Sequence, residues 1–325
     1  MALALLKSGG KDDRVASGHP LRARLRAWWE GNELPPMEAT DFVNPESPAS
    51  PGAQAEEGSP ADTPDWSPAW QQLVQLIWGE GFNGPGGEEH VLEMAKPFGL
   101  TNQNTLLEIG SGLGGGACVI VDKIKAYVDG LDFDPNLVDH AVAIAILKGF
   151  DAKAKFRLVE PGALGVRPGF YDGCFLHDTF MAVEDKEGLL ETAVGAIKLG
   201  KSIVIAEIFT GTPEPGKVAA ASLSAASLSM EHGDIFPCDA ARIVAKLKSM
   251  NVEIRVDIDE TKNCAAMARS AWSGVAGRLA RKQMDEETAD ALLYETEFWA
   301  RRHEAYESDE LQMRRIVAIK SSDAL

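Results

Sequence analysis

A glycine-rich stretch, Leu106-Leu-Glu-Ile-Gly-Ser-Gly-Leu-Gly-Gly-Gly116, constrains the fold of this chain more than any other feature. It runs from a short apolar segment, expected to be a strand, into a segment expected to be a helix. Gly110, Gly112 and Gly115 satisfy the spacing G-x-G-x-x-G, which lets the backbone turn tightly and approach a nucleotide at a helix N-terminus. The stretch therefore predicts a nucleotide-type cofactor site at the end of a buried strand.

Expected strands and helices alternate along the chain on both sides of this stretch. The five strands expected first are Thr105–Ile109, Tyr127–Phe133, Lys155–Val159, Tyr171–His177 and Ser202–Phe209. Such alternation predicts an α/β fold with a doubly wound, mostly parallel sheet. The ending differs, because a strand at Val252–Ile258 and a final strand at Met313–Lys320 enclose a long helical region over about 263–307.

The first 65 residues have a different composition from the rest. In region 1–31, Leu21, Leu25, Trp28 and Trp29 fall on one face of a helix that carries several arginines. This helix could lie on an anionic membrane surface as a peripheral contact, or dock on the main domain or at a contact between copies of the chain. Region 32–65 is acidic, rich in proline and free of Lys and Arg, so we expect a disordered linker. Region 66–325 is then the main domain.

Charge and cysteine content exclude several classes of function. The chain has 32 Lys and Arg against 49 Asp and Glu, a formal net charge of −17, which disfavours nucleic acid as a partner. Its four cysteines form no Cys-x-x-Cys pair, and no His, Cys, Asp or Glu group has metal-ligand spacing, so we expect no metal. No apolar run reaches the roughly 18 residues of a membrane span, and no signal peptide is evident, so we expect a cytoplasmic protein.

Three features favour S-adenosylmethionine (SAM) over a dinucleotide as the cofactor. Glu108 lies two residues before Gly110, where a carboxylate would repel a pyrophosphate. Two expected helices precede the first strand, and the chain ends with a strand, a helical region and a strand. In these respects it resembles class I SAM-dependent methyltransferases. The resemblance implies a Rossmann-like sheet of seven strands with an antiparallel final strand and helical additions. It also implies cofactor contacts from the glycine stretch, at Glu108, Gly110, Ser111, Gly112 and Gly114.

The resemblance extends to the next two strands. Asp132 ends the second strand and lies 18 residues beyond Gly114, the spacing of an acid that holds ribose hydroxyls. Phe133 follows it, and we include it among the cofactor contacts. Glu160 ends the third strand at the family position whose acid contacts the adenine amino group, although Pro161-Gly162 after it departs from the family pattern.

Two segments resemble the phosphoethanolamine N-methyltransferases and related small-amine enzymes. They are Gly79-Glu-Gly-Phe82, followed by Gly86-Gly87, and His177-Asp-Thr-Phe-Met-Ala-Val-Glu-Asp-Lys186. The resemblance implies that Phe82, Asp178 and Met181 contact the substrate, with Asp178 holding an amine.

The chain also departs from that family. The family's catalytic His falls at Ala182, and the Tyr expected before the glycine turn falls at about Val74. We therefore infer a shared scaffold with a different substrate.

Candidates for catalysis are His177 and Asp178. His177 ends the fourth strand, where it could take a proton from the acceptor and also lie against the cofactor, or it could be a polar strand end satisfied by the backbone. His232, in the segment after the fifth strand, is a further substrate candidate.

The sequence thus favours methyl transfer from SAM to a small-molecule acceptor, an amine or a lipid headgroup. Two alternatives remain open. The first is a SAM-binding protein that regulates or scaffolds without catalysing, because the family's His and Tyr are missing. The second is an NAD-dependent oxidoreductase, because the glycine spacing alone also suits a dinucleotide.

Overall fold

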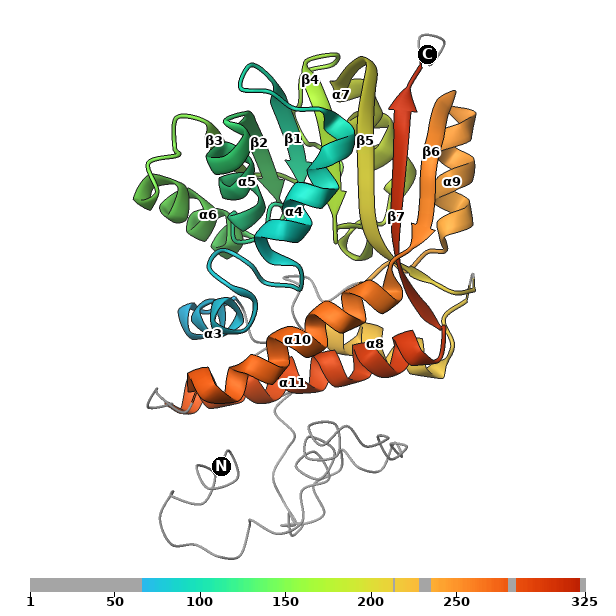
Figure 1. The fold of residues 1–325 in the computed structure, drawn as a ribbon. Coiled ribbons are helices and arrows are strands. Elements are labelled where there is room, and N and C mark those ends of the chain that lie inside the picture. The colour runs from blue at the N-terminus through green and yellow to red at the C-terminus, as the bar shows by residue number, and fades with distance from the viewer. Residues whose placement is uncertain (1–65, 213, 228–234, 280–284, 322–325) are drawn as a thin grey trace, which may run out of the picture.

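A seven-stranded sheet forms the centre of the protein, as a computed structural model describes it for residues 66–212, 214–227, 235–279 and 285–321 (Figure 1). The strands are β1 (Thr105–Ile109), β2 (Tyr127–Asp132), β3 (Ala154–Leu158), β4 (Tyr171–His177), β5 (Ile197–Thr210), β6 (Val252–Asp259) and β7 (Leu311–Lys320). Their order in the sheet is β3-β2-β1-β4-β5-β7-β6. Strands β1 to β5 pair in parallel, and β7 pairs antiparallel with both β5 and β6. The predicted Rossmann-like sheet with an antiparallel final strand is confirmed.

Helices cover both faces of this sheet. The nine α-helices of the described residues are α3 (Pro68–Trp78), α4 (Gly87–Ala95), α5 (Gly115–Val119), α6 (Pro135–Leu147), α7 (Lys186–Ala196), α8 (Lys217–Ser227), α9 (Ala240–Ser249), α10 (Thr261–Leu279) and α11 (Glu286–Glu307). Three short helical turns, η2 (Lys96–Phe98), η3 (Ile120–Ile124) and η4 (Phe180–Ala182), complete the set. The sequence did not predict α8 and α9 as helices. It also placed the start of β5 five residues late, because α7 ends at Ala196 and the strand begins at Ile197.

The two faces of the sheet follow the alternation of side chains along each strand. Leu106 of β1 and Val128 of β2 belong to the apolar cluster that α4, α5 and α6 share. Leu107 and Leu131 point the other way, into the cluster that holds α7 and α9. Because neighbouring residues on a strand face opposite sides, a strand apolar throughout its length needs cover on both faces.

A helical layer lies across one end of the sheet, at the carboxyl ends of the parallel strands. The long helical region of the sequence consists of two helices, α10 and α11, both inserted between β6 and β7 (Figure 1). Asp285 starts α11, where its carboxylate accepts a hydrogen bond from the Thr288 backbone N–H. Helices α3 and α8 pack against α11, and together these four helices form what we call the cap.

Tryptophans hold the cap together. Trp78 of α3 packs edge-on against Trp272 of α10, with ring centroids 6.3 Å apart, and its ring lies 4.7 Å from Trp299 of α11. Burial of aromatic side chains of this size contributes roughly 2–3 kcal/mol each, so the cap has an apolar core of its own.

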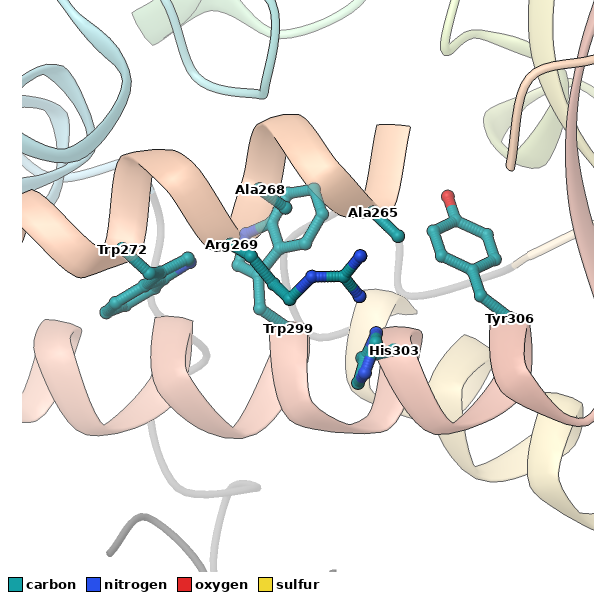
Figure 2. Close-up of a pocket in the computed structure, with 7 residues that line it drawn as sticks. All are labelled: Ala265, Ala268, Arg269, Trp272, Trp299, His303 and Tyr306. Carbon is teal, nitrogen blue, oxygen red and sulfur yellow. The ribbon is translucent and has the colours of Figure 1, made fainter. Parts of the chain in front are cut away.

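A small gap lies between α10 and α11. Arg269, Trp272 and His303 are among the side chains that meet there from the two helices (Figure 2). Its volume of about 10 Å³ is at the lower limit for one water molecule, so it is a packing defect rather than a ligand site. No helix of the described residues is long and apolar enough to cross a membrane.

The first glycine of the loop after β1 is required by close packing as well as by its backbone angle. Gly110 has φ +85°, and a Cβ there would lie 2.2 Å from the carbonyl oxygen of His177. Gly149, after α6, has a similar φ of +69°, but a Cβ there would meet no described atom within 4 Å.

We therefore expect Gly149→Ala to lower the free energy of unfolding by about 1 kcal/mol, through backbone strain alone. Gly110→Ala should lower it by about 3 kcal/mol or more, because the overlap adds to the same strain. Urea unfolding of both variants measures the difference. Equal losses would show that the loop can move away from β4 at little cost.

Candidate functional site

A cavity of about 660 Å³ lies between the carboxyl ends of the parallel strands and the cap. Loops after β1, β2, β3 and β4 line one side, and α10 and α11 line the other. Open α/β sheets bind their ligands at this edge, and the volume suits a nucleotide-sized cofactor with space beside it.

Six of the residues expected to contact a cofactor line this cavity. They are Gly110, Gly112, Asp132, Phe133, Glu160 and His177. The other three, Glu108, Ser111 and Gly114, lie outside the cavity lining formed by the described residues. Glu108, on β1, and Ser111, within the loop, are both buried, and Gly114 caps the start of α5 with φ +86°.

Asp132 ties the end of β2 to the glycine loop. Its carboxylate accepts hydrogen bonds from the backbone N–H of Gly112 at 2.7 Å and of Phe133 at 2.8 Å, with Asp134 at 3.1 Å. Burial raises the pKa of Asp132 to about 6, against the lowering effect of these three bonds. The side chain lines the cavity with a fixed orientation, as a group that binds hydroxyls would require.

The turn before α4 closes over the same loop. The Gly115 N–H donates to the Gly81 carbonyl at 2.9 Å, and a Cβ on Gly81 would lie 2.8 Å from the Gly115 Cα. Asn83 then lies beside Gly112 and lines the cavity, as do Gly84 and Pro85. The sequence singled out Phe82 in this turn for the substrate.

Phe82 is not among the described residues that line the cavity. Its ring packs with the apolar core of the cap and against Gly115. Its contact with a substrate stays a prediction, and the next three residues of the turn line the cavity. His232, the other outlying candidate, lies outside the described residues.

The end of β4 brings three predicted residues together. His177, Asp178 and Met181 all line the cavity, and Asp178 adopts a left-handed φ of +52°. The His177 ring stacks on Phe175 at 5.3 Å between centroids, and burial lowers its pKa below the ordinary value. A neutral imidazole at this place is able to accept a proton.

A second histidine, His90 of α4, also faces the cavity and was missed by the sequence analysis. Burial is the main cause that lowers its pKa to about 4, and the charge of His177 acts in the same direction. The sequence motif ends at Gly87, and α4 begins there. His90 and Met94 of α4 lie one turn apart and both line the cavity.

Glu207 of β5 faces away from the cavity, although it lies near the end of a central strand. It is fully buried, and its two carboxylate oxygens accept the N–H groups of Thr179 and Phe180 and the Thr179 hydroxyl. It therefore holds the turn after β4 in shape.

The cap supplies an aromatic wall that the sequence analysis did not predict. Trp66 stacks on Trp70 at 4.4 Å, and Trp70 meets the edge of Tyr294 at 4.9 Å. Glu295 lies among them and accepts hydrogen bonds from the indole N–H of Trp70 at 2.7 Å and of Trp299 at 3.2 Å. Burial raises the pKa of Glu295 to about 7 despite these two donors.

A signal for this wall was present in the sequence. The cavity-lining residues Glu295, Trp299, Arg302 and Tyr306 of α11 recur at i, i+4, i+7 and i+11, which is one face of a helix. That spacing predicts a shared face, but it does not say which part of the fold the face meets. Among the described residues, no group of three or more His, Cys, Asp or Glu has the arrangement of a metal site.

Glu108 lies on β1 just before the glycine loop, in an environment that shifts its pKa strongly. It is buried, and its Oε2 has no hydrogen-bond partner. Burial, followed by the charge of Asp132, raises its pKa from an ordinary 4.5 to about 8. Between those two values the folded chain keeps a proton that the unfolded chain has released. This contribution to stability is complete below pH 4.5 and is lost as the pH rises toward 8.

We therefore expect Glu108→Gln, an isostere of the protonated acid, to flatten the dependence of stability on pH. In the wild-type protein, Glu108 should lower the free energy of unfolding by up to about 1.4 kcal/mol per pH unit in this window. Urea unfolding between about pH 5 and about pH 8 gives the two slopes. Glu89→Gln, at an exposed position on α4, is the matched control and should keep the wild-type slope. Parallel slopes for all three proteins would contradict the assignment.

Comparison with known proteins gives relatives at the level of sequence and of fold. No family model matches the chain. It is 26% identical to phosphoethanolamine N-methyltransferase 1 of Arabidopsis thaliana over 133 residues, which is 41% of this chain and 27% of that protein. The chain thus spans less than a third of the length of the curated relatives that it matches first.

Solved structures extend the likeness of fold to most of the chain. Phosphoethanolamine N-methyltransferase 2 of Haemonchus contortus, in complex with phosphomonomethylethanolamine and S-adenosylhomocysteine, superposes with a TM-score of 0.68 at 19% identity. The alignment covers 79% of this chain and 59% of that one. A cyclase, SpnF, gives a TM-score of 0.61 at 12% identity, over 79% of this chain and 93% of the cyclase. The chain therefore has the class I methyltransferase fold, and its relatives in sequence are the phosphoethanolamine N-methyltransferases.

Proposed function

We propose that this protein transfers a methyl group from SAM to a small-molecule acceptor, with an amine favoured. The observation that carries the proposal is the position of Asp132, whose buried carboxylate lines the cavity while it binds the glycine loop. Relatives named as methyltransferases, and a structural neighbour solved with S-adenosylhomocysteine (SAH), support the choice of cofactor.

The cavity suits such a cofactor on its own geometry. Gly110 and Gly112 present backbone without side chains, and Asp132 offers a carboxylate for a ribose. Phe133 and Glu160 lie farther along the same wall, where they would contact an adenine ring. When bound, SAM supplies an electrophilic methyl group on a sulfonium.

The chain's own residues would act mainly by alignment. Methyl transfer is an in-line displacement, so holding donor and acceptor at the correct distance and angle supplies much of the rate. Asp178 lies at the end of β4 and lines the cavity, and no basic side chain of the described residues lies within 4.0 Å of it. Its carboxylate would hold an ammonium or a cationic product.

Proton removal would follow a different route from that of the related family. Ala182 stands where the family's catalytic His is expected, and it lines the cavity with no group that can titrate. Val74, near the position of the family's Tyr, is fully buried in the cap. His177 is left as the base, because its lowered pKa keeps the imidazole neutral near pH 7.

The alternatives lead to different observations. A scaffold or regulatory protein would bind SAM without turnover, and the loss of the family's His and Tyr favours that outcome. An NAD-dependent oxidoreductase would bind NADH, and the cyclase neighbour shows that this fold does not determine the reaction. Association of the Trp28-Trp29 helix with a lipid surface or a second copy remains a prediction, since it lies outside the described residues.

The first test is calorimetric titration with SAM, SAH and NADH. We expect micromolar binding of SAM and SAH and none of NADH. Asp132→Asn should weaken SAH binding about 10- to 100-fold, because a charge-assisted hydrogen bond is worth about 1.5–3 kcal/mol. Asp129→Asn is the matched control on the same strand, because Asp129 accepts the Tyr171 hydroxyl away from the cavity. Binding of NADH alone, or equal SAH affinity in both variants, would overturn the assignment.

A second prediction concerns His177. Once screening of amines, thiols and lipid headgroups has identified an acceptor, His177→Gln should lower kcat by about 100-fold. His303→Gln, in the small gap between α10 and α11, should leave kcat unchanged. Because the pKa of His177 is lowered, wild-type activity should persist below pH 6.5 instead of declining there. An unaltered kcat in His177→Gln would leave alignment as the sole source of catalysis.

A further inference from the structure

Methionine and aromatic side chains from several elements line the cavity. They include Met94, Met181, Met267, Met313, Phe298 and Trp299, which come from five separate elements. Methionine and aromatic side chains present polarisable, adaptable surfaces that favour a bulky apolar ligand. A small molecule with charge at both ends would leave most of this surface in contact with water.

Three arginines also line the cavity, and two of them are neutralised by carboxylates. Arg314 pairs with Asp257 at 2.6 Å, and Arg315 pairs with Glu260 at 2.8 Å. These pairs join β7 to β6 and to the start of α10. The positive charges of Arg314 and Arg315 are therefore balanced within the protein, without any ligand.

The third arginine, Arg302 of α11, has no such partner. It is 3% exposed, and no carboxylate of the described residues lies within 4.0 Å of it. Its Nε donates to the Ser222 hydroxyl at 3.0 Å, and its guanidinium lies 5.0 Å from the centre of the Phe298 ring. An unpaired buried charge is costly, so a guanidinium held this way at a cavity wall is suited to an anion within the cavity.

The neighbours of Arg302 place it in the same end of the cavity as the apolar side chains. Phe298 and Tyr306 precede and follow it by one turn of α11, and all three line the cavity. Asp178, at the end of β4, lines the same cavity as these three residues. A bound anion here would lie in the same cavity as the groups proposed for methyl transfer.

We infer that Arg302 binds an anionic group of the acceptor, and that the acceptor is an amphipathic molecule carrying a carboxylate or phosphate on a bulky apolar body. The inference rests on the proposed function, because it assumes that the cofactor occupies the glycine-loop end of the cavity. A guanidinium presents parallel N–H donors in one plane, and two oxygens of a carboxylate or phosphate can accept them together. The methionines and aromatic rings would contact the apolar body of the acceptor.

The test uses the full-length protein and two probes that differ in charge alone, hydrocinnamate and its amide, hydrocinnamide. Each is titrated calorimetrically into the protein with and without saturating SAH. With SAH present, the wild-type protein should bind the acid about tenfold more tightly than the amide. Phosphoethanolamine, which has an anion but no apolar body, should bind more weakly than hydrocinnamate.

Three variants of α11 separate the charge from the helix. Arg302→Met should abolish the preference for the acid, and Arg302→Lys should retain part of it. Arg301→Met is the matched control, because Arg301 pairs with Glu297 and lies outside the cavity lining of the described residues. It should keep the wild-type preference. If Arg302→Met does not fold by circular dichroism, the wild-type comparison and Arg302→Lys still decide the result.

Several outcomes would overturn the inference. They are equal affinity for acid and amide, tighter binding of phosphoethanolamine than of hydrocinnamate, or no measurable binding of any probe in the millimolar range. Loss of the acid preference only when SAH is present would assign Arg302 to the cofactor's own carboxylate and would also overturn it. If SAH itself does not bind but the acid is preferred, the proposed function fails while the anion site at Arg302 stands.

Discussion

The cavity depends on a close backbone contact between the glycine loop and the end of β4. Gly110 approaches the His177 carbonyl so closely that no side chain fits between them. The turn before α4 packs on the same loop, where the Gly115 N–H donates a hydrogen bond to the Gly81 carbonyl. Asp132 binds the loop to the end of β2. The end of β4, the turn before α4 and the end of β2 therefore all meet the glycine loop, which forms part of the cavity wall.

Burial, more than charge pairing, determines the electrostatics around this point. Glu108, Glu207 and Glu295 are buried carboxyls whose pKa values are all raised, and desolvation is the first cause in each case. His90 and His177 are shifted in the opposite direction, toward the neutral imidazole. Near neutral pH these side chains therefore carry fewer formal charges than their composition implies.

The cap closes the cavity on the side opposite the strands. Insertion of α10 and α11 between β6 and β7 places an aromatic helix over the carboxyl ends of the parallel strands. The indole donors of Trp70 and Trp299 meet at Glu295 and join α3 to α11. A cyclase shares this fold over 79% of the chain, so the fold alone does not determine the reaction.

Local sequence signals predicted the sheet and the strand side of the cavity. Apolar strands such as Thr105–Ile109 and Tyr171–His177 have the bounds expected. Asp132 and His177 both line the cavity, because residues at the ends of parallel strands share one edge of the sheet.

Other features were decided by tertiary packing alone. Phe82 and the three residues that follow it point in different directions because of the way the turn packs on Gly115, which no periodicity reveals. The spacing of Arg302 and Tyr306 shows that they share a helix face, but only the docking of α11 on α3 and α8 turns that face toward the cavity. The sequence by itself determined the fold and the cofactor edge, since these follow from strand order and short-range spacing. The cap side of the cavity was decided by the tertiary structure, since it is built from contacts between helices far apart in the chain.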